Sequence, residues 1–172
     1  GFVKDDKVTI EIRFWIYNMI GIRIANQFDF TDSMEPYHDV ALVIGGQKVY
    51  VSKQYLAIHS PVFNAMFYGE FAEKDKKEIE LQDVDREEFI ELLHVIYPLN
   101  KKITDGSAEF LLRLGDRFQI KCAIERAEDF YIDQSNVSNI EQLRVSDKYK
   151  LFGLQEHCLS QLKTTQDFKD IK

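Results

Sequence analysis

The fold is decided by residues 39–81, which read DVALVIGGQKVYVSKQYLAIHSPVFNAMFYGEFAEKDKKEIEL. Apolar runs over 40–44 and 48–51 flank Gly45-Gly46, and because glycine accepts a positive φ this pattern predicts a tight β-hairpin. The closing run Glu78-Ile79-Glu80-Leu81 predicts a third short strand. Two helices are expected between the hairpin and this strand, so the stretch predicts an α+β fold with a small, mainly three-stranded sheet.

Helix starts are readable from the residues that cap them. Ser60 is expected to cap a helix with Pro61 in its first turn, followed by an apolar stripe. Asp85, with Glu88 three residues later, predicts the start of the next helix. Further helical patterns follow Ala108, and Gly115 within them is expected to permit close packing. The apolar stripe after Pro61 consists of Val62, Phe63, Met66 and Phe67.

Length and charge limit the classes of function. The chain has 172 residues, of which 45% are hydrophobic, and this is enough for one domain with a core. The formal net charge of −7 argues against a partner with a nucleic-acid backbone or an anionic membrane surface. No apolar run approaches the ~20 residues that span a bilayer. The sequence starts with Gly1, so we expect a fragment of a longer protein. Because it contains only two cysteines, we expect an intracellular protein, cytoplasmic or nuclear.

Catalytic and metal-binding patterns are missing from the sequence. Cys122 and Cys158 are expected to act as small buried hydrophobes in a reducing compartment. His157-Cys158 is the nearest approach to a pair of metal ligands, but adjacent residues of a helix point in different directions. A dyad of cysteine and histidine would require a tertiary approach that the sequence does not predict. We therefore expect a protein that is not an enzyme and that holds no metal or cofactor.

The N-terminal residues have a different pattern from the rest. Val8–Tyr17 alternates apolar and polar residues, as in a strand with one buried face. It has no obvious partner strand, so we expect it to be poorly packed, and either the last strand of an upstream domain or padding for the domain that follows. The stretch after it is expected to be a linker in which Phe28 and Phe30 dock on a surface.

Residues throughout the chain resemble the BTB (POZ) domain of MATH-BTB proteins, which are substrate adaptors of cullin-3 ubiquitin ligases. The first eleven residues resemble the end of a MATH domain, and Val137–Lys163 resembles the helical three-box or BACK-like extension that follows a BTB core. The resemblance within the core is carried by Asp39-Val40, Leu56-Ala57, Ser60-Pro61-Val62-Phe63, Met66-Phe67, Val84, Phe89, Ile96-Tyr97, Leu114, Asp116 and Phe118. The resemblance implies domains at 1–24 (MATH remnant), 25–38 (linker), 39–132 (BTB/POZ) and 133–172 (helical extension).

Site residues follow from the same resemblance. Phe71-Ala72-Glu73 is similar to the hydrophobic-x-Glu motif with which such domains dock cullin-3. Spacing alone favours a core position for Phe71, whereas the resemblance implies that Phe71 is an anchor for the partner and that Glu73 caps a partner helix. Tyr55 resembles a dimer-interface residue, and a half-buried helix position explains it equally well. The implied partners are cullin-3, a second copy of the chain, and substrates held by the missing MATH domain.

Three other functions remain open from the sequence. A BTB module can serve only for self-association or for binding a corepressor, without any role in a ligase. A tetramerising, potassium-channel type of BTB domain is disfavoured by the run Ser60-Pro61-Val62-Phe63 and by the downstream helices. An enzyme would require a motif that the sequence does not contain.

Overall fold

The computed structural model describes residues 29–33, 36–69, 76–97, 99 and 101–162, together with two short strands near the N-terminus. These strands, β1 (Val3–Lys4) and β2 (Lys7–Val8), pair antiparallel, with Val3 opposite Val8. Of the strand predicted over Val8–Tyr17, only Val8 lies within the described residues. Its packing therefore stays a prediction.

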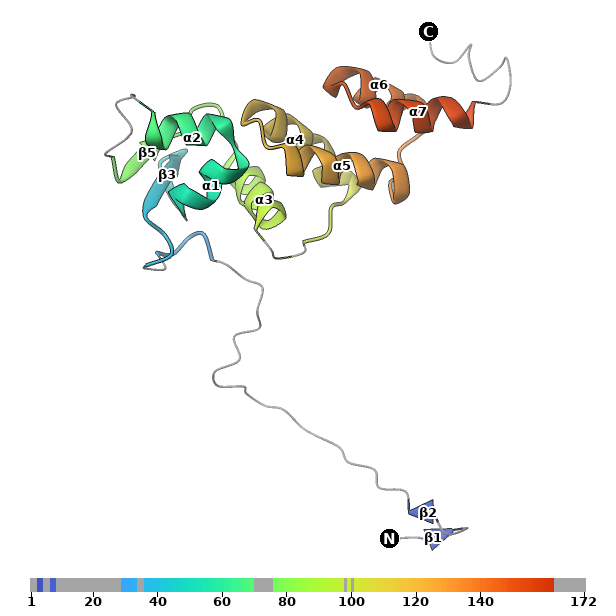
Figure 1. Cartoon of the computed structure of the whole chain (residues 1–172), viewed down its shortest axis with the longest axis horizontal. Coiled ribbons are helices and arrows are strands. Elements are labelled where there is room, and N and C mark those ends of the chain that lie inside the picture. The colour runs from blue at the N-terminus through green and yellow to red at the C-terminus, as the bar shows by residue number, and fades with distance from the viewer. Residues whose placement is uncertain are drawn as a thin grey trace.

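A three-stranded sheet forms one end of the molecule (Figure 1). Its strands are β3 (Val40–Ile44), β4 (Gln47–Val51) and β5 (Glu78–Glu80), in the order β4-β3-β5. The hairpin between β3 and β4 turns at Gly45 and Gly46, whose φ values of 56° and 78° confirm the predicted glycine turn. β5 instead runs parallel to β3, and a parallel pair requires a crossover connection.

Helices supply the crossover and the rest of the fold. The first two stand between β4 and β5 in the sequence, and the next three pack one on another between the sheet end of the molecule and the last two helices (Figure 1). The last two form a pair that packs on α4 and α5, at the end of the described helices opposite the sheet (Figure 1). The helices are α1 (Lys53–His59), α2 (Pro61–Tyr68), α3 (Arg86–Ile96), α4 (Asp105–Arg117), α5 (Lys121–Asp133), α6 (Asn139–Tyr149) and α7 (Phe152–Gln161). This architecture confirms the predicted α+β class.

The predicted caps are present. Ser60 is fully buried, and its Oγ accepts the N–H of Phe63 at 3.0 Å while donating to the carbonyl of Phe118 at 2.5 Å. The Oδ1 of Asp85 accepts the N–H of Glu88 at 3.0 Å and so begins α3, while the Glu88 carboxylate pairs with Arg113 of α4 in place of completing a capping box. Each cap satisfies a backbone donor that would otherwise lack a partner in the first turn of its helix.

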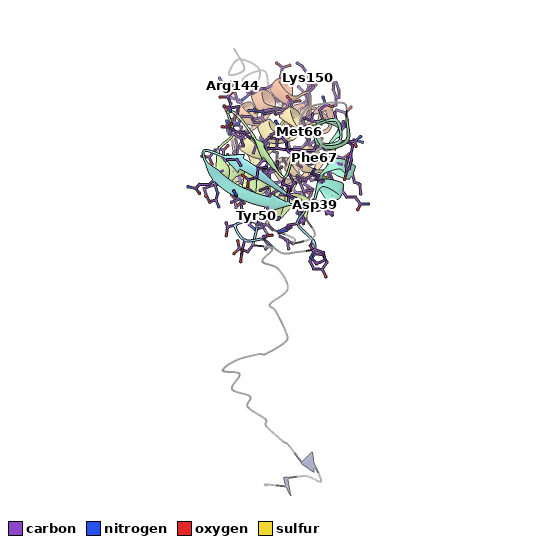
Figure 2. The ribbon with its side chains drawn as sticks, turned by 90° about the vertical axis from the view of Figure 1, so that its left-hand side faces the viewer. Asp39, Tyr50, Met66, Phe67, Arg144 and Lys150 are labelled. Carbon is purple, nitrogen blue, oxygen red and sulfur yellow. The ribbon has the colours of Figure 1, made fainter. Side chains whose placement is uncertain are left out.

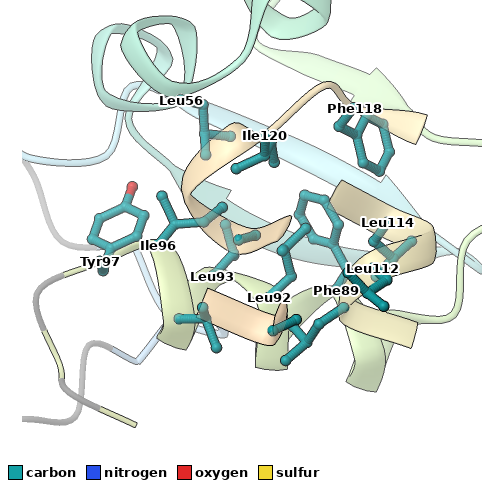
Figure 3. Packing of buried hydrophobic residues seen from close by; sticks show 14 of the residues in the cluster. Leu56, Phe89, Leu92, Leu93, Ile96, Tyr97, Leu112, Leu114, Phe118 and Ile120 are labelled. Atoms are coloured by element: carbon teal, nitrogen blue, oxygen red, sulfur yellow. The ribbon is translucent and has the colours of Figure 1, made fainter. Parts of the chain in front are cut away.

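An aromatic and aliphatic core lies between the sheet and the first five helices (Figure 3). The ring of Phe118 stacks on Phe63 at 4.8 Å and meets Phe89 edge-on at 5.7 Å. Leu92 and Leu93 of α3 fill the same layer with no exposed surface. The hydrogen bond from Ser60 to the carbonyl of Phe118 also joins the start of α2 to the end of α4, within the same core.

The segment before β3 is docked on this core. Phe30 is 1% exposed, and its ring meets that of Tyr97 edge-on at 4.9 Å. Its carbonyl accepts the N–H of Tyr50 at 2.8 Å, on the side of β4 away from β3, which covers part of an edge strand. The docking expected for Phe30 is confirmed, whereas Phe28 lies outside the described residues.

Candidate protein-interaction surface

The segment that contains the predicted partner contacts joins α2 to β5. α2 ends at Tyr68, where the N–H of Gly69 donates to the carbonyl of Ala65 at 2.8 Å. Phe71 and Glu73 lie outside the described residues, so their roles stay predictions. The elements on either side of this segment, α2 and β5, are described, and they define the positions of its two ends.

A largely apolar groove lies between those two flanking elements. α2 buries Phe63 and Phe67 and leaves the neighbouring Val62 and Met66 half-buried. Figure 2, which faces the sheet end of the molecule, shows Met66 beside Phe67. The groove has a volume of about 510 Å³ and is lined by Pro61, Val62, Ala65, Met66, Ile79, Glu80 and Gln119.

Three distant parts of the sequence build this groove. Ile79 of β5 is buried, while Glu80 beside it points to solvent. Gln119 follows α4 in a left-handed conformation with φ of 52°, because the N–H of Ile120 returns to the carbonyl of Gly115 at 2.7 Å. The groove thus combines an apolar lining with an exposed carboxylate at its rim, as docking sites for an amphipathic helix do.

Tyr55 is half-buried and already has partners within the chain. Its hydroxyl donates to the carbonyl of Ile96 at 3.0 Å, and its ring lies 4.2 Å from Tyr97 and 4.8 Å from His59. Burial raises the pKa of the Tyr55 hydroxyl, which keeps it neutral as a donor. Tyr55 therefore connects α1 to α3 and remains partly exposed.

Another apolar surface lies on α1 and α2. Ile58 is 73% exposed and Tyr68 is 52% exposed. They line a shallow groove of about 410 Å³ with Gln54, Ala57 and Asn64. Exposed Ile and Tyr side chains at one place are typical of a contact surface. The sequence analysis missed both grooves, although the stripe after Pro61 contains residues of the first.

One cysteine and one histidine do meet in the tertiary structure. The Sγ of Cys122 in α5 lies 3.8 Å from the Nδ1 of His59 in α1. Burial raises the pKa of the Cys122 thiol, which favours the protonated form and makes it a poor nucleophile. Cys158 is buried as expected, Cys122 is half-buried, and both are free thiols. Among the described residues, no group of three or more His, Cys, Asp or Glu side chains is placed to hold a metal.

The described helices include none that is long and apolar enough to cross a membrane. Two accessible apolar grooves lie on the described surface, one between α2 and β5 and the other on α1 and α2. Accessible apolar grooves of this kind are typical of a protein-interaction domain.

Comparison with known proteins identifies the family. The sequence profile of the BTB/POZ domain matches residues 30–136, and the chain belongs to this family. The predicted resemblance to BTB domains is thereby confirmed. The BTB domain of human gigaxonin is similar in structure over 56% of this chain and 79% of that one, with 20% identity and a TM-score of 0.48.

Relatives in Caenorhabditis elegans are named for both BTB and MATH domains. BTB and MATH domain-containing protein 38 is 41% identical over 172 residues, which is 100% of this chain and 44% of the relative. Protein 36 of the same name is 40% identical over 173 residues, covering 99% of this chain and 53% of the relative. The chain thus spans about half the length of these curated relatives. The residues before the BTB match have counterparts in them, consistent with the predicted remnant of a MATH domain.

Proposed function

We infer that the chain is the scaffold-binding part of a substrate adaptor for a cullin-3 ubiquitin ligase. The observation that carries this proposal is the apolar groove between α2 and β5, because segment 70–75, with the Phe71-Ala72-Glu73 motif, connects those two elements. The chain thus leaves one wall of the groove at the end of α2 and enters the other wall at β5. The resemblance of that motif to cullin-binding BTB domains supplies the identity of the partner.

The groove suits a helical partner with an apolar face. Val62 and Met66 are four residues apart on α2, so their side chains lie on the same face one turn apart. An apolar anchor of the partner would lie against them, and we propose that Phe71 adds a further apolar contact. Glu73 would accept hydrogen bonds from the first turn of the partner helix, where the helix dipole favours a carboxylate. The hydrophobic contact and the charged contact then reinforce each other.

Self-association is the other half of the proposal. α1 carries Tyr55 and the exposed Ile58 close together, and a two-fold axis near them would bring the same apolar surface from two copies into contact. Because Tyr55 is only half-buried, it can keep its hydrogen bond to Ile96 in its own chain and also contact a second copy. A BTB module that uses this surface alone, for self-association or for a corepressor, is the alternative function.

The relatives' names supply a role for the complete protein. A MATH domain upstream of this chain would hold a substrate while the BTB domain holds the ligase. Tethering the substrate near the transferred ubiquitin raises its effective concentration, to the order of mM for a short linker. The linkage itself then accelerates ubiquitin transfer, and the chain needs no catalytic residue for it.

Calorimetric titration of the chain into the cullin-3 N-terminal domain tests the proposal. We expect a dissociation constant between about 1 nM and 1 µM, on the order of −12 to −8 kcal/mol. The Phe71→Ala/Glu73→Ala variant and, separately, Met66→Asp should each weaken binding by about tenfold or more. The matched control is Tyr37→Ala/Asp32→Ala, which also removes an exposed aromatic ring and a carboxylate, from the segment before β3.

The outcomes separate the two candidate functions. Loss of binding in both site variants and normal binding in the control support the adaptor. No binding by a folded wild-type chain contradicts it and leaves the self-association module. Normal binding by the Phe71→Ala/Glu73→Ala variant would contradict the assigned contact even if cullin-3 is bound.

A further inference from the structure

A pocket of about 350 Å³ lies between α5 and the segment that leads from α3 to α4. Its lining includes Lys101, Lys102 and Ile103 of that segment and Arg126, Asp129 and Phe130 of α5. The three residues of α5 are three and four positions apart, so they share one face of the helix. None of these side chains lines the groove between α2 and β5, so the two sites are separate.

The guanidinium of Arg126 is held in place at this pocket. Its Nη1 donates to the carbonyl of Val95, in the last turn of α3, and its Nη2 donates to the carbonyl of Lys101 at 3.3 Å. A guanidinium has five N–H donors, and these two bonds leave others free. Because the fold has already fixed the position of Arg126, an acceptor that binds to it pays little entropy for ordering the side chain.

Positive charge predominates in the pocket. Lys101 is ion-paired with Glu91, whereas Lys102 is exposed and forms no ion pair with any described residue. Among the described residues of the lining, Asp129 is the only carboxylate. The whole chain has a formal net charge of −7, so the pocket is a local concentration of positive charge on an acidic molecule. Such a pocket attracts a single negative group of a ligand.

The lining favours a peptide carboxylate over a phosphate group. A protein-bound phosphate carries about −1.5 to −2 charges at neutral pH, and the carboxylate of Asp129 would repel it more strongly than a single charge. The net charge of −7 also opposes a polyanion such as nucleic acid. The half-buried Ile103 and the edge of Phe130, which is 7% exposed, add apolar surface beside the cations. Apolar lining with a few polar groups suits a peptide side chain next to a carboxylate.

We propose that this pocket binds a short acidic segment of a partner protein, in which a Glu or Asp side chain lies next to an apolar residue. The carboxylate accepts hydrogen bonds from Arg126 and pairs with Lys102. The apolar neighbour lies against Ile103 and Phe130. The site gives the domain a second peptide contact, and it does not depend on the cullin-3 proposal or on dimerisation through α1, because it shares no lining residue with either groove.

NMR titration of the full, nitrogen-15-labelled chain with the peptide acetyl-Leu-Glu-Leu-amide tests the proposal. We expect the amide signals of 101–103 and 126–134 to shift, with a dissociation constant on the order of 1 mM for so short a ligand. The matched peptide acetyl-Leu-Gln-Leu-amide has the same shape without the charge. It should bind about fivefold more weakly, because hydrogen bonds to a charged acceptor are the stronger ones.

Two substitutions in the pocket should act in opposite directions. Lys102→Gln should weaken binding of the acidic peptide by about threefold, and Asp129→Asn should tighten it by about threefold, since both positions are exposed and lie in the pocket. The matched control Lys121→Gln, on α5 but outside the pocket, changes the net charge as Lys102→Gln does and should leave the affinity nearly unchanged. Unchanged amide signals in β3 and α2 verify that each variant is folded.

Four results would overturn the proposal. Equal affinity for the two peptides would show that the pocket does not recognise the carboxylate. Equal weakening by Lys102→Gln and Lys121→Gln would assign the effect to the overall charge of the chain. Shifts confined to residues outside 101–103 and 126–134 would place the peptide elsewhere. Inorganic phosphate that shifts the same amides at a lower concentration than the peptide would make the pocket a general anion site.

Discussion

At Gly115, helix α4 passes so close to the start of α5 that a side chain would collide. A Cβ there would lie 2.9 Å from the Cγ1 of Ile124 and 3.5 Å from the carbonyl of Ile120. We predict that Gly115→Ala lowers the free energy of unfolding by about 1–3 kcal/mol, because Ile124 must move within a packed layer. Urea denaturation with an unchanged slope measures this loss.

Gly106 supplies the matched control on the same helix. A Cβ there would meet only the Oγ1 of Thr104, at 3.9 Å. Gly106→Ala should therefore be neutral or should stabilise by up to about 1 kcal/mol through helix propensity. Equal effects of the two substitutions would contradict the close approach at Gly115.

Tyr97 gives the protein a predictable alkaline sensitivity. Burial raises the pKa of Tyr97 from its ordinary value of 10.0 to about 12, although the N–H of Ser52, 3.3 Å from its hydroxyl, favours ionisation. The unfolded chain therefore releases this proton at lower pH than the folded one, so the stabilisation is complete below pH 10 and is lost between about pH 10 and pH 12. We expect the free energy of unfolding to fall by on the order of 1–3 kcal/mol over that window.

The variant Tyr97→Phe isolates this contribution. It should be less stable than the wild type at neutral pH, since Ser52 loses an acceptor, and its stability should fall less steeply above pH 10. Denaturation at several pH values measures both effects, and Tyr37→Phe, at a 67% exposed position, is the control. A Tyr97→Phe variant with the wild-type alkaline slope would contradict the assignment.

At the scale of helices and strands, one carboxylate joins α5, inside the BTB match, to α7, beyond that match. The Oε1 of Glu128 in α5 accepts the N–H of Leu154 in the first turn of α7 at 2.9 Å. A carboxylate at this position satisfies a free donor and also interacts favourably with the helix dipole. This hydrogen bond connects α5 to α7, the last helix of the described residues.

We predict that Glu128→Ala loosens α7 while the core keeps its stability. Exchange of the α7 amides should rise about tenfold, equivalent to about 1.4 kcal/mol, with α3 and α4 unchanged. The control Glu125→Ala, on the same helix, removes only an exposed ion pair with Lys121 and should have little effect. Unchanged exchange in α7 would show that packing alone holds this helix.

Elements that depend on local chemistry could be predicted from the sequence. Ser60 with Pro61, Asp85 with Glu88 and the turn at Gly45-Gly46 all act through the backbone of their immediate neighbours, and the structure places each as expected. The close packing expected at Gly115 is also present.

Features assembled from distant residues could not be predicted in the same way. The stripe after Pro61 has one periodicity, yet Phe63 and Phe67 are buried while Val62 and Met66 line a groove, because β5 and the turn after α4 cover only part of α2. The meeting of Cys122 in α5 with His59 in α1 likewise joins residues 63 positions apart in the sequence. Periodicity identifies a buried face but not where the neighbouring element ends.

At the scale of the whole molecule, self-association must overcome the repulsion between two acidic chains. Each copy carries a formal net charge of −7. An interface at α1 would be held by apolar contact around Tyr55 and Ile58, which salt does not screen, while salt does screen the repulsion. Dimerisation through α1 should therefore strengthen between about 50 mM and 500 mM salt, the opposite of an interface held by ion pairs.

Analytical ultracentrifugation tests this prediction with two substitutions on α1. We expect the wild type to sediment at twice its mass of 20.2 kDa, and Ile58→Asp to sediment as a monomer. Ile58 is 73% exposed, so its replacement should not unfold the chain. Tyr55→Phe removes the hydrogen bond to the carbonyl of Ile96 but keeps the ring, and should remain dimeric. A monomeric wild type, or a dimer unaffected by Ile58→Asp, would remove α1 from the interface and leave Tyr55 as a residue that joins α1 to α3.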